Sequence, residues 1–289
     1  MAENAHEFSR YVDVVAALAD PGLVPVPPAP NVANAPSAPG TAAWLRENVA
    51  RFASGSSHER RRAIVEAELD RIDPESLRHA ATLATKDAGD TFDARMVVVR
   101  VLAEALSLPD PEGVAHDVAV VAGVYFGGES PEADAAVTRL AVVAQHDGEH
   151  DPETVANRIG LLVQACDATA SLVNQAREAA GRNEQAAGHD ADALMAETLR
   201  HDPPVRAIQR VAIRATTVGG TAIAAGDRVT LNIAAANRDP KVFERPDEFE
   251  PGRPETEMTA LTFGAEPRRC PGRSQALALA AGILIVLSA

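Results

Sequence analysis

The sequence predicts a mainly α-helical protein with a small β region. Apolar residues recur at helical spacing over most of the chain, whereas strand-like patterns are concentrated between residues 205 and 242. Aromatic residues make up only 3% of the chain, and alanine and valine are abundant. This composition indicates a helix-rich core built from small side chains.

The totals limit the function classes that need to be considered. The chain has 289 residues, enough for a large core, and its 27 basic and 41 acidic residues give a formal net charge of −14. This acidic balance argues against nucleic-acid binding, which requires a basic surface. The N-terminal segment is polar, the longest apolar run is too short to cross a bilayer, and the two cysteines do not suggest a disulfide framework. We therefore expect a soluble, cytoplasmic protein.

In the first half of the chain, helical patterns alternate with turns and caps. A segment rich in proline and alanine, over residues 21–40, is expected to be a loop. Ser56 and Glu59 have the spacing of a capping box, and Ser130 followed by Pro131 indicates another helix start. The helices expected in this half span residues 11–20, 41–53, 56–70, 91–106, 113–126 and 130–145.

The second half begins with the longest helical pattern, from Asp151 to about Ala180. A polar connector leads to a short helix over residues 191–200. Glycine-containing turns then separate three expected strands. These strands span residues 211–215, 221–223 and 228–233, and a final apolar helix is expected over residues 274–287.

One cysteine stands in an unusual setting immediately before that final helix. In the stretch from Phe263 to Gly272, Cys270 lies between arginine residues and a Pro-Gly turn. A cysteine at a helix N-terminus, beside cationic side chains, favours the thiolate form. Thiolates bind soft metals and haem iron. The alternative for a single cysteine is a small buried residue of the core.

This stretch resembles the haem-binding loop of the cytochrome P450 family, whose pattern is Phe-x-x-Gly-x-Arg-x-Cys-x-Gly. Phe263, Arg268, Cys270 and Gly272 match it, whereas Glu266 stands where the family usually has glycine. The resemblance implies a cytochrome P450-like fold, truncated or compact, in a single haem domain over residues 1–289. It also implies haem b as the cofactor, with Cys270 as the iron ligand and Phe263 beside the porphyrin.

Cationic side chains elsewhere in the chain suit the anionic carboxylates of a haem. His58 and Arg62 lie four residues apart, on one face of the helix expected there. The resemblance implies that both bind a haem propionate and that Arg210 and Arg268 do the same. From the residues alone, a solvated basic face is the alternative for His58 and Arg62, because two further arginines adjoin them.

The middle of the longest helix contains polar residues that need a partner or a function. Asp167 and Thr169 lie in an apolar helix interior, where unpaired polar groups cost stability. The resemblance implies an acid–alcohol pair that delivers protons, and Thr169 matches the alcohol. Ala168 occupies the acid's usual position, so the Asp167 carboxylate is turned about 100° around the helix. The alternative for Thr169 is a hydroxyl that bonds to a carbonyl of the preceding turn, and the alternative for Asp167 is a structural polar contact. Cys166 is interpreted as core.

A Glu-x-x-Arg sequence precedes the cysteine loop. Glu197 and Arg200 alone would be an ordinary pair on a solvated helix. The resemblance implies that Arg253 completes a carboxylate–arginine cluster, which fixes the segment carrying Cys270 and takes no part in the chemistry. The run from 193 to 273 resembles bacterial members of the family most closely.

The chain is short for this family. We expect the N-terminal sheet region and the final hairpin to be absent, and the segment between the first propionate-binding helix and the central helix to be shortened. These regions line the substrate pocket in the family. A compact natural variant, a fragment and a form completed by self-association all fit this expectation, and an exposed truncated core favours a homo-oligomer.

Three functions follow from the resemblance. The first is a haem-thiolate monooxygenase that oxidises a small apolar, secondary-metabolite-like substrate with O2 and two electrons from ferredoxin-type partners. The second keeps the haem without O2 activation, as in group transfer, rearrangement, dehydration or peroxide-driven oxidation. The third is a non-catalytic auxiliary relative that stabilises another enzyme, against which Cys270 and the four cationic residues argue.

Overall fold

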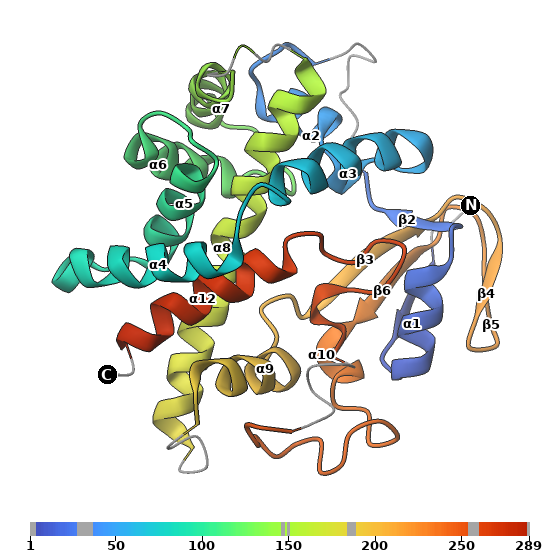
Figure 1. The fold of residues 1–289 in the computed structure, drawn as a ribbon. Coiled ribbons are helices and arrows are strands. Elements are labelled where there is room, and N and C mark those ends of the chain that lie inside the picture. The colour runs from blue at the N-terminus through green and yellow to red at the C-terminus, as the bar shows by residue number, and fades with distance from the viewer. Residues whose placement is uncertain are drawn as a thin grey trace. The chain divides into compact units, whose positions relative to one another are not determined.

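The computed structural model describes residues 4–27, 37–145, 148, 151–183, 189–253 and 260–287. The chain forms two compact units, whose elements are labelled in Figure 1. Unit 1 comprises residues 1–26 and 171–273, and unit 2 comprises residues 27–170 and 274–289. The long helix α8 (Pro152–Arg182) contributes to both. The predicted fold class, mainly helical with a small β region, is confirmed.

Unit 1 contains two sheets. In the larger sheet the strand order is β1-β6-β3-β2. β1 pairs in parallel with β6, whereas β3 is antiparallel to both of its neighbours. β4 and β5 form a separate antiparallel pair. The strands span Ala5–Phe8 (β1), Leu23–Pro25 (β2), Ala207–Ala212 (β3), Thr216–Val218 (β4), Thr221–Ile223 (β5) and Arg228–Asn232 (β6).

The two N-terminal strands show that the expected absence of an N-terminal sheet region was wrong. β1 pairs Ala5 with Arg228, and β2 pairs Leu23 with Ala212, inside the segment predicted as loop. Both strands are too short for an alternating pattern to be recognised in the sequence. Pairing with distant strands is what defines them, and no local signal reports it.

The core of unit 1 lies between the larger sheet and α1 (Tyr11–Ala19). Val14, Ala17 and Leu18 of α1 are buried in the same apolar cluster as Val229 of β6. Their spacing is that of one face of an amphipathic helix. The helix expected over residues 11–20 is therefore confirmed.

Unit 2 is helical throughout its described residues. α4 contacts α5, α5 contacts α6, and α6 contacts α7. Side-chain oxygens of Asp73, Asp93 and Ser130 cap the N-termini of α4, α5 and α7. The helices span Ala42–Asn48 (α2), Ala50–Phe52 (η1), Gly55–Leu69 (α3), Pro74–Ala88 (α4), Gly89–Thr91 (η2), Ala94–Ala105 (α5), Pro111–Ala122 (α6), Pro131–Val143 (α7) and Arg273–Leu287 (α12).

The helices expected in this part of the chain are confirmed with ends shifted by a few residues, except that the helix expected over residues 41–53 is interrupted at Val49 and divides into α2 and η1. The capping box was wrong, because α3 starts at Gly55 after Ser54 and Ser56 lies inside its first turn. α4 was not predicted at all, although Asp73 followed by Pro74 is a recognisable start signal.

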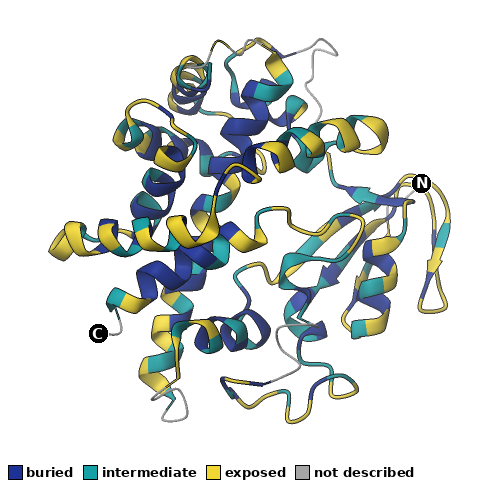
Figure 2. Ribbon diagram, viewed as in Figure 1, coloured by how far each residue is buried: buried dark blue, intermediate teal, exposed yellow. Residues whose placement is uncertain are grey.

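The apolar helix α12 packs closely on α4. A side chain at Gly282 would collide with the Arg78 carbonyl oxygen and lie 2.9 Å from Cβ of Ala81. Figure 2 shows α12 buried over much of its length. None of the helices in the described ranges is long and apolar enough to cross a membrane.

Candidate functional site

Unit 1 buries a glutamate and two arginines that the sequence predicts as one cluster. Glu197 and Arg200 lie on α9 (Ala191–His201) and are fully buried, and Arg253 is 6% exposed. Arg200 donates two hydrogen bonds to the Glu197 carboxylate, at 2.9 and 2.6 Å. Arg253 donates to the same carboxylate at 3.4 Å. The predicted carboxylate–arginine cluster is therefore confirmed.

The cluster holds α9 against the irregular segment that follows the short helix α10 (Ile233–Ala236). Arg200 also donates to the carbonyl oxygens of Pro246, at 2.6 Å, and Glu248, at 2.8 Å. Arg253 donates to the carbonyl oxygen of Glu244. Because these guanidinium groups have little access to water, the carbonyl acceptors replace the hydration that burial removes.

Asn237 joins this cluster to the loop that carries the cysteine. Its backbone carbonyl accepts a hydrogen bond from Arg200 at 3.3 Å. Its side chain accepts from the N–H of Leu261 at 2.7 Å and donates to the Thr262 hydroxyl at 3.0 Å. These two residues begin η4 (Leu261–Phe263), which leads directly into the loop. Sequence reasoning missed Asn237, because only the fold decides what a buried asparagine contacts.

Backbone hydrogen bonds close the cysteine loop on itself. The N–H of Cys270 donates to the Phe263 carbonyl at 2.8 Å, and the N–H of Arg268 donates to Ala265 at 3.0 Å. Gly264 has a φ of +71°, a conformation that suits glycine. Cys270 is exposed and lies just before α12. The loop therefore presents the thiol at a surface of unit 1 on an ordered backbone.

Glu266 occupies the family's glycine position without a left-handed backbone. Among the described non-glycine residues, only Ser107, Asp110 and Arg245 have a positive φ. The Glu266 carboxylate lies 3.8 Å from the guanidinium group of Arg269. The departure from the family pattern therefore causes no φ strain at this position.

The sheet that carries Arg210 also supports the cysteine loop. Arg210 lies on β3, opposite Val229 of β6, and is 4% exposed. Leu261 belongs to the same apolar cluster as Val229, and Ala265 packs against that cluster. Unit 1 thus contains four of the predicted haem-binding residues, namely Phe263, Arg268, Cys270 and Arg210.

The chemistry of these side chains fits a haem. An exposed thiol can supply a thiolate ligand, and two arginines suit the carboxylates of a porphyrin. The described residues contain no group of three or more His, Cys, Asp or Glu side chains that could hold a metal ion. A haem needs only one strong axial ligand from the protein, and Cys270 can provide it.

The other predicted propionate ligands, His58 and Arg62, lie on α3 of unit 2. His58 is partly buried, and Arg62 forms an i,i+4 ion pair with Glu66 at 2.7 Å. Arg60 and Arg61, which lie between His58 and Arg62 in the sequence, both form ion pairs with Glu153 on α8. The haem-binding roles of His58 and Arg62 stay predictions.

The polar residues of α8 have different surroundings. Thr169 is 3% exposed, whereas Asp167 is exposed and forms an ion pair with Arg95 of α5 at 2.6 Å. Cys166 is fully buried, and burial raises the pKa of its thiol, opposed by a hydrogen bond from Arg95. Cys166 is therefore a core residue, as expected. The proton-delivery roles of Asp167 and Thr169 stay predictions.

Comparison with known proteins places the best-matched segment around the cluster and the cysteine loop. The sequence model of the family described as Cytochrome P450 matches residues 191–284. That range begins at the first residue of α9 and ends inside α12. It contains Glu197, Arg200, Arg210, Arg253 and Cys270.

Two curated relatives match parts of the chain. It is 40% identical over 85 residues to "Putative cytochrome P450 137" from Mycobacterium tuberculosis. It is 42% identical over 77 residues to linalool 8-monooxygenase from Pseudomonas putida. These matches cover 28% and 27% of this chain but only 18% of each relative.

A solved structure shows the same fold. P450BioI, in complex with an acyl carrier protein ligated to hexadec-9Z-enoic acid, has a TM-score of 0.78 at 18% identity. The match covers 97% of this chain and 83% of that one. Residues 191–284 thus match the cytochrome P450 superfamily, and the described chain has the fold of a solved cytochrome P450.

Proposed function

We propose that this chain is a haem-thiolate monooxygenase that oxidises a small apolar substrate. The observation that carries the proposal is the exposed Cys270 thiol on a hydrogen-bonded loop, anchored through Asn237 to the buried Glu197–Arg200–Arg253 cluster. A loop anchored by hydrogen bonds in this way fixes the orientation of a metal ligand on it. A bond between a thiolate and iron requires such a fixed orientation.

In this proposal Cys270 would hold the iron of haem b through its thiolate. When bound, the haem supplies the electron-transfer and O2 chemistry. Arg210, Arg268, His58 and Arg62 donate hydrogen bonds to its propionates. To bind a propionate, Arg62 gives up its i,i+4 ion pair with the half-exposed Glu66. This loss costs little, because exposed ion pairs contribute little to stability.

We assign proton delivery to Thr169 and Asp167. The hydroxyl of Thr169 is shielded from bulk water by burial, so a proton it holds is not exchanged at random with solvent. The Asp167 carboxylate is 57% exposed to solvent, and Arg95 holds it in place. Asp167 supplies the proton in this assignment, and Thr169 passes it on.

The substrate we propose is a small apolar molecule of the secondary-metabolite type, and the electrons come from a ferredoxin and its reductase. One relative is named for the oxidation of linalool, and P450BioI is described with a fatty-acid-ligated acyl carrier protein. Both names support an apolar substrate. Self-association into a homo-oligomer is part of the same proposal.

The reduced, carbon-monoxide-bound spectrum of the haem-supplied protein tests the proposal. We expect the far-red-shifted Soret band of a thiolate-ligated haem in the wild type and its loss in Cys270→Ala. Cys166→Ala is the matched control, since it removes the buried core cysteine and should keep the band. An unchanged band in Cys270→Ala would refute the assignment of the ligand.

A second candidate function, haem-thiolate chemistry without O2 activation, is favoured by one observation. The acid position before Thr169 is occupied by Ala168, and the nearby carboxylate of Asp167 is paired with Arg95. Conversion of substrate under argon, without reductant, would establish this function. Turnover that requires both O2 and reductant would instead support the monooxygenase function.

A further inference from the structure

Arg51 of unit 2 lies between two aromatic rings. Its guanidinium carbon is 5.6 Å from the ring centroid of Phe52 and 5.5 Å from that of Phe126. The two rings meet edge to face, at 6.0 Å between centroids. Phe126 is 70% exposed, so part of this arrangement is open to solvent. The aromatic faces hold the guanidinium group in one position.

Arg51 has no counter-ion in the described part of the chain. It forms no hydrogen bond or ion pair there, whereas Arg46, Arg60 and Arg61 all bond to carboxylate or carbonyl oxygens. Partial burial lowers the pKa of Arg51, because desolvation disfavours its charge. A desolvated guanidinium group with unused N–H donors is stabilised when an anion binds to it.

Tyr125 supplies a second unused donor beside the same rings. It is 2% exposed, its ring lies 5.3 Å from Phe52 and 5.4 Å from Phe126, and its hydroxyl has no hydrogen-bond partner among the described residues. Burial raises the pKa of Tyr125 and the nearby Arg51 cation lowers it, so the two groups interact. Buried phenol hydroxyls usually have a partner, and a ligand oxygen can be that partner.

α8 packs closely beside the Tyr125 hydroxyl. A Cβ on Gly160 of α8 would lie 3.4 Å from the hydroxyl oxygen and 2.8 Å from Cγ1 of Val49. Glycine therefore allows α8 to approach closely at this point. It also presents no side chain that could take the ligand's place at the hydroxyl.

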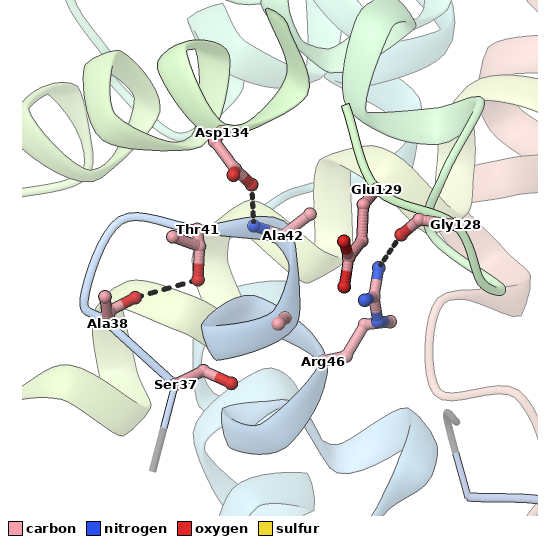
Figure 3. Close-up of a pocket in the computed structure, with 9 residues that line it drawn as sticks. Ser37, Ala38, Thr41, Ala42, Arg46, Gly128, Glu129 and Asp134 are labelled. Carbon is pink, nitrogen blue, oxygen red and sulfur yellow. Dashed lines mark hydrogen bonds between the residues drawn. The ribbon is translucent and has the colours of Figure 1, made fainter. Parts of the chain in front are cut away.

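Arg46 holds the turn that carries Tyr125 and Phe126. It donates to the carbonyl oxygens of Val124 at 3.0 Å and Gly128 at 3.3 Å, and Figure 3 shows the second of these bonds. A cavity of about 240 Å³ adjoins Arg46, but Glu129 and Asp134 line it. Because two carboxylates face that cavity, it does not suit an anion.

We propose that the Arg51 cluster, composed of Arg51, Phe52, Tyr125 and Phe126, binds the carboxylate of an apolar small molecule. The N–H groups of Arg51 and the O–H of Tyr125 donate to the carboxylate oxygens, and the exposed face of Phe126 packs against the apolar part. A planar carboxylate matches the guanidinium fork, and one cation balances its single negative charge. This inference goes beyond the proposed function, because it concerns binding by unit 2 and does not depend on haem chemistry.

Calorimetric titration of the full, haem-supplied protein with decanoate and with 1-decanol tests the proposal. The two probes share their chain and differ in the carboxylate. We expect the wild type to bind decanoate about ten-fold more tightly than decanol, as a charge-assisted pair predicts. Arg51→Gln should remove this preference and Tyr125→Phe should reduce it, with decanol binding unchanged in both.

Arg182→Gln is the matched control, because Arg182 is exposed and its replacement removes the same charge. Circular dichroism shows whether each variant is folded, and Arg51→Lys should retain part of the preference because it keeps the charge.

Equal affinities for the two probes, or an unchanged preference in Arg51→Gln, overturn the proposal. Tighter binding of decyl phosphate than of decanoate overturns the carboxylate as the ligand class. The carbon-monoxide spectrum of the same samples reports the haem separately from binding.

Discussion

At the scale of single residues, Glu197 shows how a buried charge is supported. It accepts hydrogen bonds from Arg200, Arg253 and the N–H of Glu250, and it is fully buried. The net stability of such an arrangement is small, because desolvation offsets the attraction. Removing one partner is costly, since the remaining charges stay buried without compensation.

We therefore predict that Glu197→Gln lowers the free energy of unfolding by about 3–5 kcal/mol, because two buried arginines lose their carboxylate. Urea unfolding followed by circular dichroism measures the loss. Glu178→Gln is the control, since its pair with Arg182 is exposed and its removal should change stability by less than about 0.5 kcal/mol. Similar losses in both variants would contradict the structural role of the cluster.

Residue-scale prediction from the sequence succeeded where local chemistry is distinctive. The cysteine before an apolar helix and the Glu-x-x-Arg sequence could be recognised without a structure. The partners of Asn237 and Arg51 could not, because each depends on segments that are distant in the chain or on the arrangement of neighbouring rings.

At the scale of elements, close helix packing depends on single glycines. Gly282 of α12 faces α4 so closely that no side chain fits there. The Thr82 hydroxyl donates to the Gly282 carbonyl at 3.0 Å, which confirms how near the two helices lie. The contact is made by backbone, and backbone cannot move aside as the end of a flexible side chain can.

We predict that Gly282→Ala destabilises the protein by about 1–3 kcal/mol, because the added methyl group forces α12 away from α4. Thermal unfolding measures the change. Gly181→Ala, in α8, is the matched control, because nothing lies within 4 Å of its added methyl group. That variant should gain about 0.5–1 kcal/mol from helix propensity. A loss in Gly181→Ala equal to that in Gly282→Ala would exclude the packing explanation.

Element prediction followed the length and periodicity of each segment. The longest helix was expected to end at about Ala180, but α8 continues through Gly181 to Arg182, since glycine reduces helix propensity without preventing a helix. The short strands β1 and β2 escaped prediction, because three or four residues do not display a period.

At the scale of the whole molecule, an acidic chain keeps several carboxylates ionised by pairing them. Hydrogen bonds from Arg60 and Arg61 lower the pKa of Glu153 to about 2, from an ordinary value of 4.5, although burial opposes the shift. Hydrogen bonds also lower the pKa values of Asp73, Asp227 and Asp239. A carboxyl group whose pKa is lowered in the folded state stabilises the fold above its unfolded pKa. It loses that contribution as the pH falls through its folded value.

We therefore predict that the thermal midpoint falls as the pH decreases from about 5 towards 2. Glu153→Gln should be less stable than the wild type at pH 7, and the difference should shrink over the same interval. Differential scanning calorimetry across this pH range measures both effects. A difference that stays constant with pH would show that Glu153 does not titrate with the lowered pKa.

The sequence by itself determined the fold class, the long helices and the candidate cysteine ligand, because these depend on periodicity and on residues adjacent in the chain. Only the tertiary structure decided the pairing of β1 and β2, the support of the cysteine loop through Asn237, and the position of Arg51 over its aromatic neighbours. Those features arise from contacts between distant segments. A local pattern does not specify them, since burial and hydrogen-bond partners exist only once the chain has folded.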